Sequence, residues 1–170
     1  MDVKEYIATI GRKYAQGNAT EHSYRGCLEQ LLQEMLPQMA VTNEPKRVRC
    51  GAPDYIITRT DGQPVCYIEA KDIGDADLDG RNPHLHREQF DRYKASLGRV
   101  IFTDYLDFHF YANGQWVENI RIGEVQGDKV VPLKENAERF HSAIIRFAQA
   151  DPQPVTTAAQ LASLMAAKAR

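Results

Sequence analysis

The chain has 170 residues, the size of one domain, and its 43% hydrophobic and 26% charged residues are ordinary for a globular protein with one core. Eight Tyr and six Phe argue against disorder, and no apolar run approaches the roughly 18 residues of a membrane helix, so no membrane partner is expected. The net charge of −2 excludes a strongly basic nucleic-acid binder but not a local basic face, and the odd number of three Cys fits a reducing, cytoplasmic compartment.

Helices are expected first in chain order. Residues 3–15 form one candidate helix, and Thr20 is a good N-cap for a second helix, which Pro37 ends. Alternating apolar residues around Asp61-Gly62 then predict a hairpin. The expected elements beyond the second helix are strands at 39–44, 54–59 and 64–70, a loop at 75–83, a helix at 84–97, a strand at 100–105, a hairpin over 107–122 and a helix at 134–149.

Residues 1–150 are expected to form one α/β domain, in which helices flank a mixed sheet of about five strands. Asp151 and Pro154 break the last helix of that domain, and 151–170 are expected to be a linker and a short helix. One interpretation is that this short helix docks on its own domain. We favour the other interpretation, in which it leads toward a following domain and the chain is a fragment of a larger protein.

Chemically informative residues gather in the hairpin over 54–70, which carries Pro-Asp in one strand and Glu-Ala-Lys in the other. Since residues i and i+2 share a face of a strand, Glu69 and Lys71 point the same way, and Val65 and Tyr67 share their face. Apolar residues on both faces indicate an interior strand, in which charges are costly unless they are paired, bind metal or line a cleft. Counting back from the turn, Asp54 lies opposite Glu69 or the next residue.

Two carboxyl groups and an ammonium group are therefore expected to meet at one end of the sheet. Mutual repulsion raises the pKa of one carboxyl group unless a divalent cation lies between them, and hard oxygen ligands suit Mg²⁺ or Mn²⁺. The alternative is a turn aspartate and a surface ion pair on an edge strand, because each short motif is common alone. Their combination in one hairpin behind a suitable helix favours a functional site.

The order of elements around PD and EAK resembles the PD-(D/E)xK nuclease superfamily. The longer pattern NEPKRVRCGAPDYIITR, CYIEAKDIG and FTDYLDFHFY resembles the N-terminal nuclease domain of large single-chain restriction–modification enzymes of the Type ISP kind. This resemblance covers about residues 20–125. It implies a restriction-endonuclease-like core within residues 1–150 and a Mg²⁺-dependent endodeoxyribonuclease, in which Mn²⁺ substitutes for Mg²⁺.

The resemblance also implies roles for individual residues. Asp54 and Glu69 match the acidic metal-binding positions, and Lys71 matches the motif lysine, so all three are candidate catalytic residues. Glu21 opens the core-facing stripe of the second helix and is a candidate third metal ligand, as helix glutamates are in this superfamily. The plainer explanation of Glu21 is an acidic residue that favours a helix N-terminus.

A second motif lies in the helix over 84–97. Gln89 and Tyr93 share a helix face in QFDRY, which resembles the Q-x-x-x-Y element of RecB-like nucleases. We assign Gln89 to the catalytic group and Tyr93 to the DNA-contacting group, and an ordinary amphipathic helix is the alternative. The basic candidates for phosphate contacts, which a solvated charged face explains equally well, are Lys46, Arg47, Arg49 and Arg87.

The implied partners are DNA and further domains of the same full-length chain, namely a methyltransferase and optionally a helicase, in a prokaryotic cytoplasm. A transient dimer would serve double-strand cleavage. One competing function is a catalytically silent nuclease-fold module for nucleic-acid or domain–domain interaction. Another is a carboxylate-pair hydrolase acting on sugars, which the lysine two residues after the glutamate fits poorly.

Overall fold

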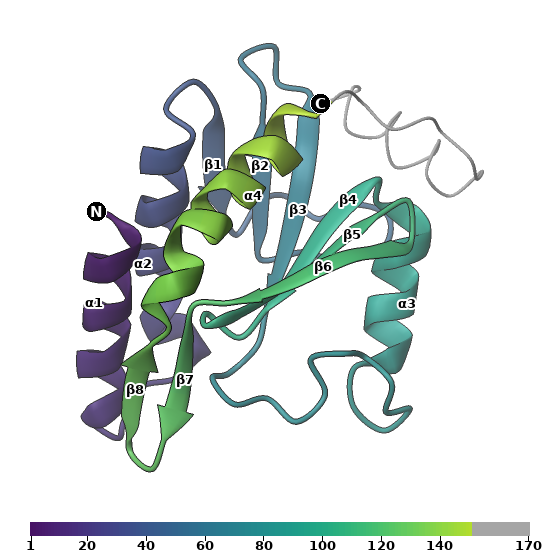
Figure 1. Cartoon of the computed structure of the whole chain (residues 1–170). Coiled ribbons are helices and arrows are strands. Elements are labelled where there is room, and N and C mark those ends of the chain that lie inside the picture. Colours follow the sequence, from purple (N-terminus) through teal and green to yellow (C-terminus); the bar gives the residue numbers. More distant parts are fainter. Residues whose placement is uncertain (151–170) are drawn as a thin grey trace.

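The computed structural model describes residues 1–150, and the predicted linker and helix at 151–170 lie outside the described residues. Helices precede and follow a run of short strands (Figure 1). The elements are α1 Val3–Ala15, α2 Glu21–Met35, β1 Ala40–Asn43, β2 Tyr55–Thr58, β3 Pro64–Ala70, α3 Arg87–Ser96, β4 Arg99–Thr103, β5 Asp107–Ala112, β6 Gln115–Arg121, β7 Gly123–Gln126, β8 Lys129–Pro132, η1 Lys134–Asn136 and α4 Ala137–Gln149. Within this range no helix is long and apolar enough to cross a membrane.

The central sheet contains six strands in the order β1-β2-β3-β4-β5-β6. Strands β3 and β4 pair in parallel, and all other neighbours in this sheet are antiparallel. A parallel pair requires a crossover connection, and the segment that contains α3 supplies it. Strand β3 is interior, as its two apolar faces predict, and it carries Glu69 to the end of the strand.

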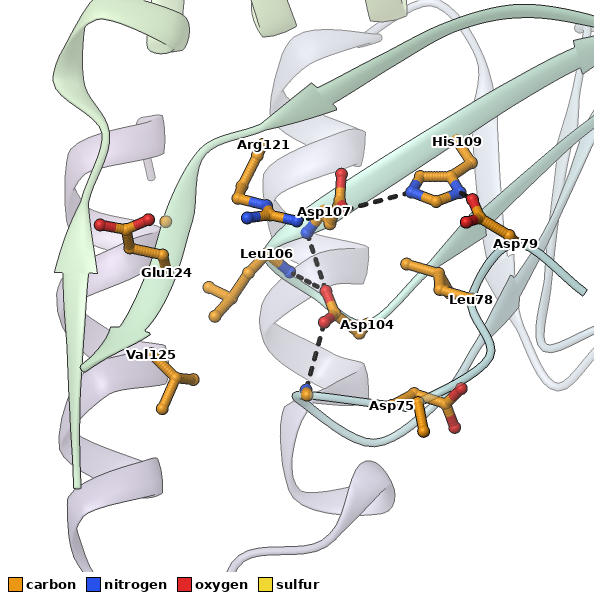
Figure 2. Close-up of a pocket in the computed structure, with 13 residues that line it drawn as sticks. Asp75, Leu78, Asp79, Asp104, Leu106, Asp107, His109, Arg121, Glu124 and Val125 are labelled. Carbon is orange, nitrogen blue, oxygen red and sulfur yellow. Dashed lines mark hydrogen bonds and ion pairs between the residues drawn. The ribbon is translucent and has the colours of Figure 1, made fainter. Parts of the chain in front are cut away.

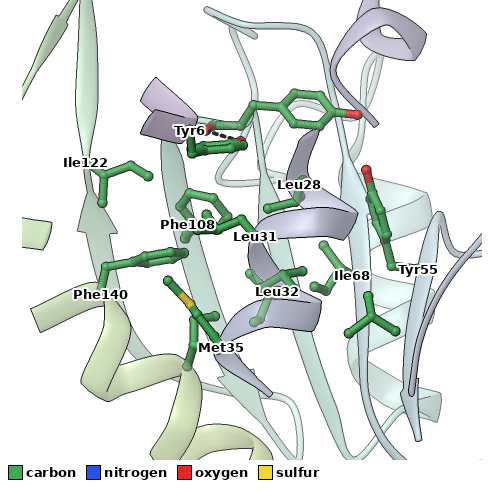
Figure 3. Packing of buried hydrophobic residues seen from close by; sticks show 14 of the residues in the cluster. Tyr6, Leu28, Leu31, Leu32, Met35, Tyr55, Ile68, Phe108, Ile122 and Phe140 are labelled. Carbon is green, nitrogen blue, oxygen red and sulfur yellow. Dashed lines mark hydrogen bonds between the residues drawn. The ribbon is translucent and has the colours of Figure 1, made fainter. Parts of the chain in front are cut away.

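The sheet is covered by helices on both faces, with α1, α2 and α4 on one side and α3 on the other (Figure 1). The larger apolar cluster joins α1, α2 and α4 to β3 and β5. Leu28, Ile68 and Phe140 are among its buried members (Figure 3). The smaller cluster packs Phe90 of α3 against Phe102 of β4, with ring centroids 3.9 Å apart. The strand that bears Glu69 is therefore shielded from water on both sides over most of its length.

Local chemistry explains where the main elements begin and turn. The Asp2 carboxylate accepts a hydrogen bond from the Glu5 N–H and caps α1, and the Ser23 hydroxyl accepts one from the Thr20 N–H ahead of α2. Asn113 and Gly114 have positive φ values of 50° and 77°, as the tight turn between β5 and β6 requires. The predicted helix at 3–15 and both predicted hairpins are confirmed. The predicted helix at 134–149 is confirmed over Ala137–Gln149, with the 3-10 turn η1 at Lys134–Asn136 before it.

Four details differ from the sequence predictions. The sheet has six strands rather than about five, and β7 and β8 form a separate antiparallel pair beside α1 that apolar alternation did not reveal (Figure 1). Helix α3 begins at Arg87 rather than 84, because Asn82 and Asp77 side chains bind the N–H groups of His84 and His86. Strand β3 contains a register shift beside Val65, which packs in the larger cluster while Tyr67 packs in the smaller one.

Candidate active site

The β2–β3 hairpin places Asp54 beside Glu69. Tyr55 pairs with Ile68, so Asp54 lies opposite Glu69, and the Asp54 Oδ2 atom accepts a hydrogen bond of 2.8 Å from the Ala70 N–H. Asp54 is 8% exposed, and burial raises the pKa of its carboxyl group, although the Ala70 N–H and the Arg25 guanidinium oppose that shift. The structure therefore brings the two acidic residues together as the hairpin count predicts.

The carboxyl group of Glu69 has a more strongly raised pKa than that of Asp54. Its side chain is buried, and burial together with the Asp54 charge raises its pKa to about 8. Oε1 accepts hydrogen bonds from Lys71 Nζ at 3.4 Å and from Gln89 Nε2 at 3.2 Å. Within residues 1–150, the buried Oε2 atom has no hydrogen-bond partner. A buried polar atom without a partner is costly, so this oxygen is suited to receive a cation or a donor from a ligand.

Lys71 at the start of the crossover segment and Gln89 in the first turn of α3 meet beside Glu69. Lys71 directly follows β3, and its N–H donates to the Thr103 carbonyl oxygen of β4. Its Nζ atom donates to Gln89 Oε1 at 2.8 Å, while Gln89 Nε2 donates to Glu69. Gln89 therefore binds the ammonium and the carboxylate at once and fixes their relative position.

Helix α2 supplies the third acidic candidate and a residue that the sequence did not single out. Glu21 Oε1 lies 3.0 Å from Arg25 Nη2, and the same nitrogen lies 2.7 Å from Asp54 Oδ1. The negative charge of Glu21 raises the pKa of both Asp54 and Glu69, so Glu21 belongs to the same electrostatic cluster. An i, i+4 spacing on a helix joins Glu21 to Arg25, but nothing in the sequence relates Arg25 to Asp54.

Two tyrosines anchor α2 against the sheet at this cluster. The Tyr55 hydroxyl donates to the Arg25 carbonyl oxygen at 2.9 Å, and the Tyr105 hydroxyl donates to the Glu21 carbonyl oxygen at 3.0 Å. Both tyrosines are buried. These hydrogen bonds from buried side chains to backbone carbonyl oxygens hold the first turns of α2 against the strands. They therefore fix where Glu21 and Arg25 lie.

Tyr93 is placed differently from its expected role. It is 1% exposed and packs in the smaller cluster beneath α3, and burial raises its pKa to about 12. A buried ring does not meet DNA, so we remove Tyr93 from the DNA-contacting residues. Its position below Gln89 on the same helix makes it a support for the site.

Replacing Gly51 with Ala is expected to lower the free energy of unfolding by about 1 to 3 kcal/mol. Gly51 has a φ of 145°, and a Cβ atom there would lie 2.7 Å from the Tyr93 hydroxyl oxygen, so both the backbone and the tyrosine must shift. Urea denaturation measures the change. Gly26→Ala on the exposed face of helix α2, where a Cβ atom meets nothing within 4 Å, is the matched control and should not destabilise. A Gly51→Ala variant as stable as the native protein would contradict this packing.

The basic candidates lie on the surface. Lys46, Arg47 and Arg49 are exposed in the segment between β1 and β2, where Val48 and Gly51 exchange backbone hydrogen bonds of 2.8 and 3.1 Å. Arg87 is exposed at the start of α3 and lies 3.9 Å from Asp91. These positions leave all four side chains accessible to a phosphate backbone.

The segment between Lys71 and α3 is tied to the sheet beside a pocket of about 320 Å³ (Figure 2). Asp104 accepts hydrogen bonds from the N–H groups of Gly74, Leu106 and Asp107. His109 lies between carboxylates, 3.1 Å from Asp107 and 3.4 Å from Asp79. Asp54, Glu69 and Lys71 are not among the residues that line the pocket, so we interpret this network as support for the segment that positions Lys71 and Gln89.

The donor set fits a hard divalent cation without forming a complete cage. Among residues 1–150, no group of three or more His, Cys, Asp or Glu side chains is arranged to hold a metal ion. The carboxylates of Asp54 and Glu69 are adjacent, one Glu69 oxygen has no partner within the same range, and Glu21 is close enough to influence both. Mg²⁺ commonly binds proteins through one or two carboxylates and retains several waters, which matches this arrangement.

Comparison with known proteins identifies the fold. No protein-family profile and no curated protein sequence matches this chain. Its structure is similar to a chain in the cryo-electron microscopy structure of a DrdV–DNA complex, with a TM-score of 0.66 and 20% sequence identity. The match covers 88% of this chain and 14% of that chain, so the present chain spans a small part of the length of its structural relative. The predicted α/β fold with a restriction-endonuclease-like core is confirmed.

Proposed function

We propose that this chain is the metal-dependent DNA endonuclease domain of a restriction–modification enzyme and that it hydrolyses phosphodiester bonds. The observation that carries the proposal is the meeting of Asp54, Glu69 and Lys71 at one end of an interior hairpin, with one buried Glu69 oxygen lacking a partner among the described residues. Perturbed carboxyl groups beside a lysine in a water-shielded site are typical of catalytic centres. The similarity to a chain of a DrdV–DNA complex supports DNA as the substrate.

In this proposal Asp54 and Glu69 would hold Mg²⁺, for which Mn²⁺ would substitute. Glu21, which Arg25 links to Asp54 in this structure, would move to become the third ligand. When bound, the ion would supply the positive charge that favours attack of water on the phosphorus. Lys71 places an ammonium group beside Glu69, where it stabilises negative charge that develops on the phosphate. Gln89 keeps the ammonium in place through its 2.8 Å hydrogen bond. The buried position of Asp54 and Glu69 limits the access of bulk water to the ligands.

Other parts of a longer protein would complete this activity. The chain matches 14% of the DrdV chain, and a net charge of −2 gives it little general attraction for DNA. We therefore propose that methyltransferase and optional helicase domains of the same prokaryotic, cytoplasmic protein supply sequence recognition and most DNA affinity. Transient pairing of two such domains would allow cleavage of both strands.

Nicking of supercoiled plasmid tests the proposed reaction. We expect weak, non-specific nicking by the isolated chain at high protein concentration with Mg²⁺ or Mn²⁺, because the recognition domains are missing. The same preparation should give no nicking in EDTA. Nicking that persists in EDTA would contradict a metal-dependent mechanism.

Replacing Arg47 and Arg49 together with Ala is expected to weaken DNA binding equally for all sequences. Each phosphate contact contributes about 0.9 to the slope of log affinity against log salt concentration, so the slope should fall by about 2. Fluorescence anisotropy with a labelled duplex at several salt concentrations measures that slope. Arg139→Ala, which removes an exposed side chain of helix α4, is the control and should leave the slope unchanged. An unchanged slope in the double variant would exclude these side chains from the DNA interface.

A further inference from the structure

Arg25 occupies the position between two of the carboxylates that we propose as metal ligands. Its Nη2 atom lies 2.7 Å from Asp54 Oδ1 and 3.0 Å from Glu21 Oε1, so a single nitrogen bridges the two side chains. The Arg25 side chain is 12% exposed and the Asp54 side chain 10% exposed, which keeps this contact largely out of water. An ion shared by Asp54 and Glu21 would use the same oxygen atoms.

The guanidinium group supplies the positive charge that this site otherwise lacks on the α2 side. Three carboxylates surround it, because Nη1 also lies 2.8 Å from Glu44 Oε1. Lys71 is the cation on the other side of the cluster, next to Glu69. Two adjacent buried carboxylates repel each other unless a cation separates them, so Arg25 stabilises the site in the absence of a metal ion.

The same arrangement allows the Arg25 guanidinium group to leave Asp54. Its buried Nε atom has no hydrogen-bond partner within the described residues, so its present position is incompletely satisfied. Its third partner, Glu44, is much more exposed than Asp54: the Glu44 side chain is 69% exposed and the Asp54 side chain 10%. A displaced guanidinium can therefore keep a charged partner at the surface while it leaves Asp54.

We propose that Arg25 is an exchangeable counter-charge, which neutralises Asp54 and Glu21 in the metal-free site and must be displaced before these carboxylates bind a divalent cation. This inference rests on the proposed metal site. Because a bound cation and Arg25 compete for the same oxygens, Arg25 lowers the affinity of the site for metal. Its role is to position the ligands and to set that affinity, and it takes no part in bond cleavage.

Calorimetric titration of Mn²⁺ into native protein and Arg25→Gln tests the competition. At about pH 8.5, where ordinary carboxyl groups are ionised, the variant should bind Mn²⁺ roughly tenfold more tightly than the native protein. Arg139→Gln removes an exposed arginine from the remote helix α4 and should bind as the native protein does. Circular dichroism and a thermal melt establish that each variant is folded.

A second measurement needs no substitution. Mg²⁺ titration of the ¹⁵N-labelled native protein should shift the Arg25 Nε–H resonance and speed its exchange with water, because the group leaves its buried position. Two results would contradict the proposed displacement of Arg25 by a cation. One is equal or weaker Mn²⁺ binding by a folded Arg25→Gln, and the other is an Arg25 resonance that does not move at saturating Mg²⁺. If native protein and Arg25→Gln both bind no Mn²⁺, the metal site itself is wrong, and the proposed function fails together with this inference.

Discussion

Replacing Glu69 with Gln is expected to reduce metal-dependent plasmid nicking by about 100- to 1,000-fold or more while leaving the protein folded. The amide keeps the shape of the side chain but offers the cation a neutral oxygen instead of a charged one. Loss of activity in a protein that melts at or above the native temperature would separate a catalytic role from a structural one. Native-like nicking by Glu69→Gln would exclude this carboxylate from the mechanism.

The same substitution is expected to change how stability depends on pH. Burial and the Asp54 charge raise the pKa of folded Glu69 from 4.5 to about 8, so between these values the folded protein retains a proton that the unfolded chain has lost. Native stability should therefore fall as pH rises through this window, by on the order of 5 kcal/mol from this group. Glu69→Gln should lose this part of the dependence, which urea denaturation at several pH values measures. Parallel pH profiles for the two proteins would contradict the burial of an ionising group.

Replacing Lys71 with Ala is expected to lower nicking by about 100-fold or more without abolishing metal binding. The ammonium group lies 3.4 Å from Glu69 Oε1 and 2.8 Å from Gln89 Oε1, so its removal takes positive charge from the reaction site but leaves both acidic ligands. Because Lys71 lowers the pKa of Glu69, the variant should also require higher pH for Mn²⁺ binding.

Lys129→Ala is the matched control for this experiment. Lys129 is exposed in β8, outside the hairpin that carries the site, and its loss should leave nicking unchanged. Equal activity in Lys71→Ala and native protein would remove Lys71 from the mechanism. A Lys71→Ala variant that no longer binds Mn²⁺ at any pH would instead indicate that the lysine is needed to form the site.

The central hairpin could be predicted from the sequence because its determinants are local. Asp61-Gly62 fixes the turn, and strand alternation then brings Asp54 opposite Glu69 and keeps Lys71 near the same end. The helix that contains Gln89 was also predicted, since its apolar spacing and the preceding polar loop are local signals. The convergence of Gln89 on Lys71 follows only from the crossover that packs α3 on the sheet.

What the sequence did not reveal depends on tertiary packing. Arg25 contacts Asp54 because buried Tyr55 and Tyr105 hold α2 against the sheet, and no periodic pattern encodes that contact. Tyr93 is buried by the placement of α3 as a whole. Most residues of β7 and β8 are exposed or half-buried, so no buried apolar face distinguishes these strands from a loop.

Titration of Mn²⁺ into native protein, Asp54→Asn and Glu69→Gln tests most directly whether these two carboxylates bind a divalent cation. We predict binding by the native chain, with or without a DNA duplex, and loss of that binding in both variants, each of which should remain folded. Absence of Mn²⁺ binding by the native protein under both conditions, or binding that survives both substitutions, would contradict a metal site at Asp54 and Glu69. The first of these results would favour a catalytically silent module built on the nuclease fold.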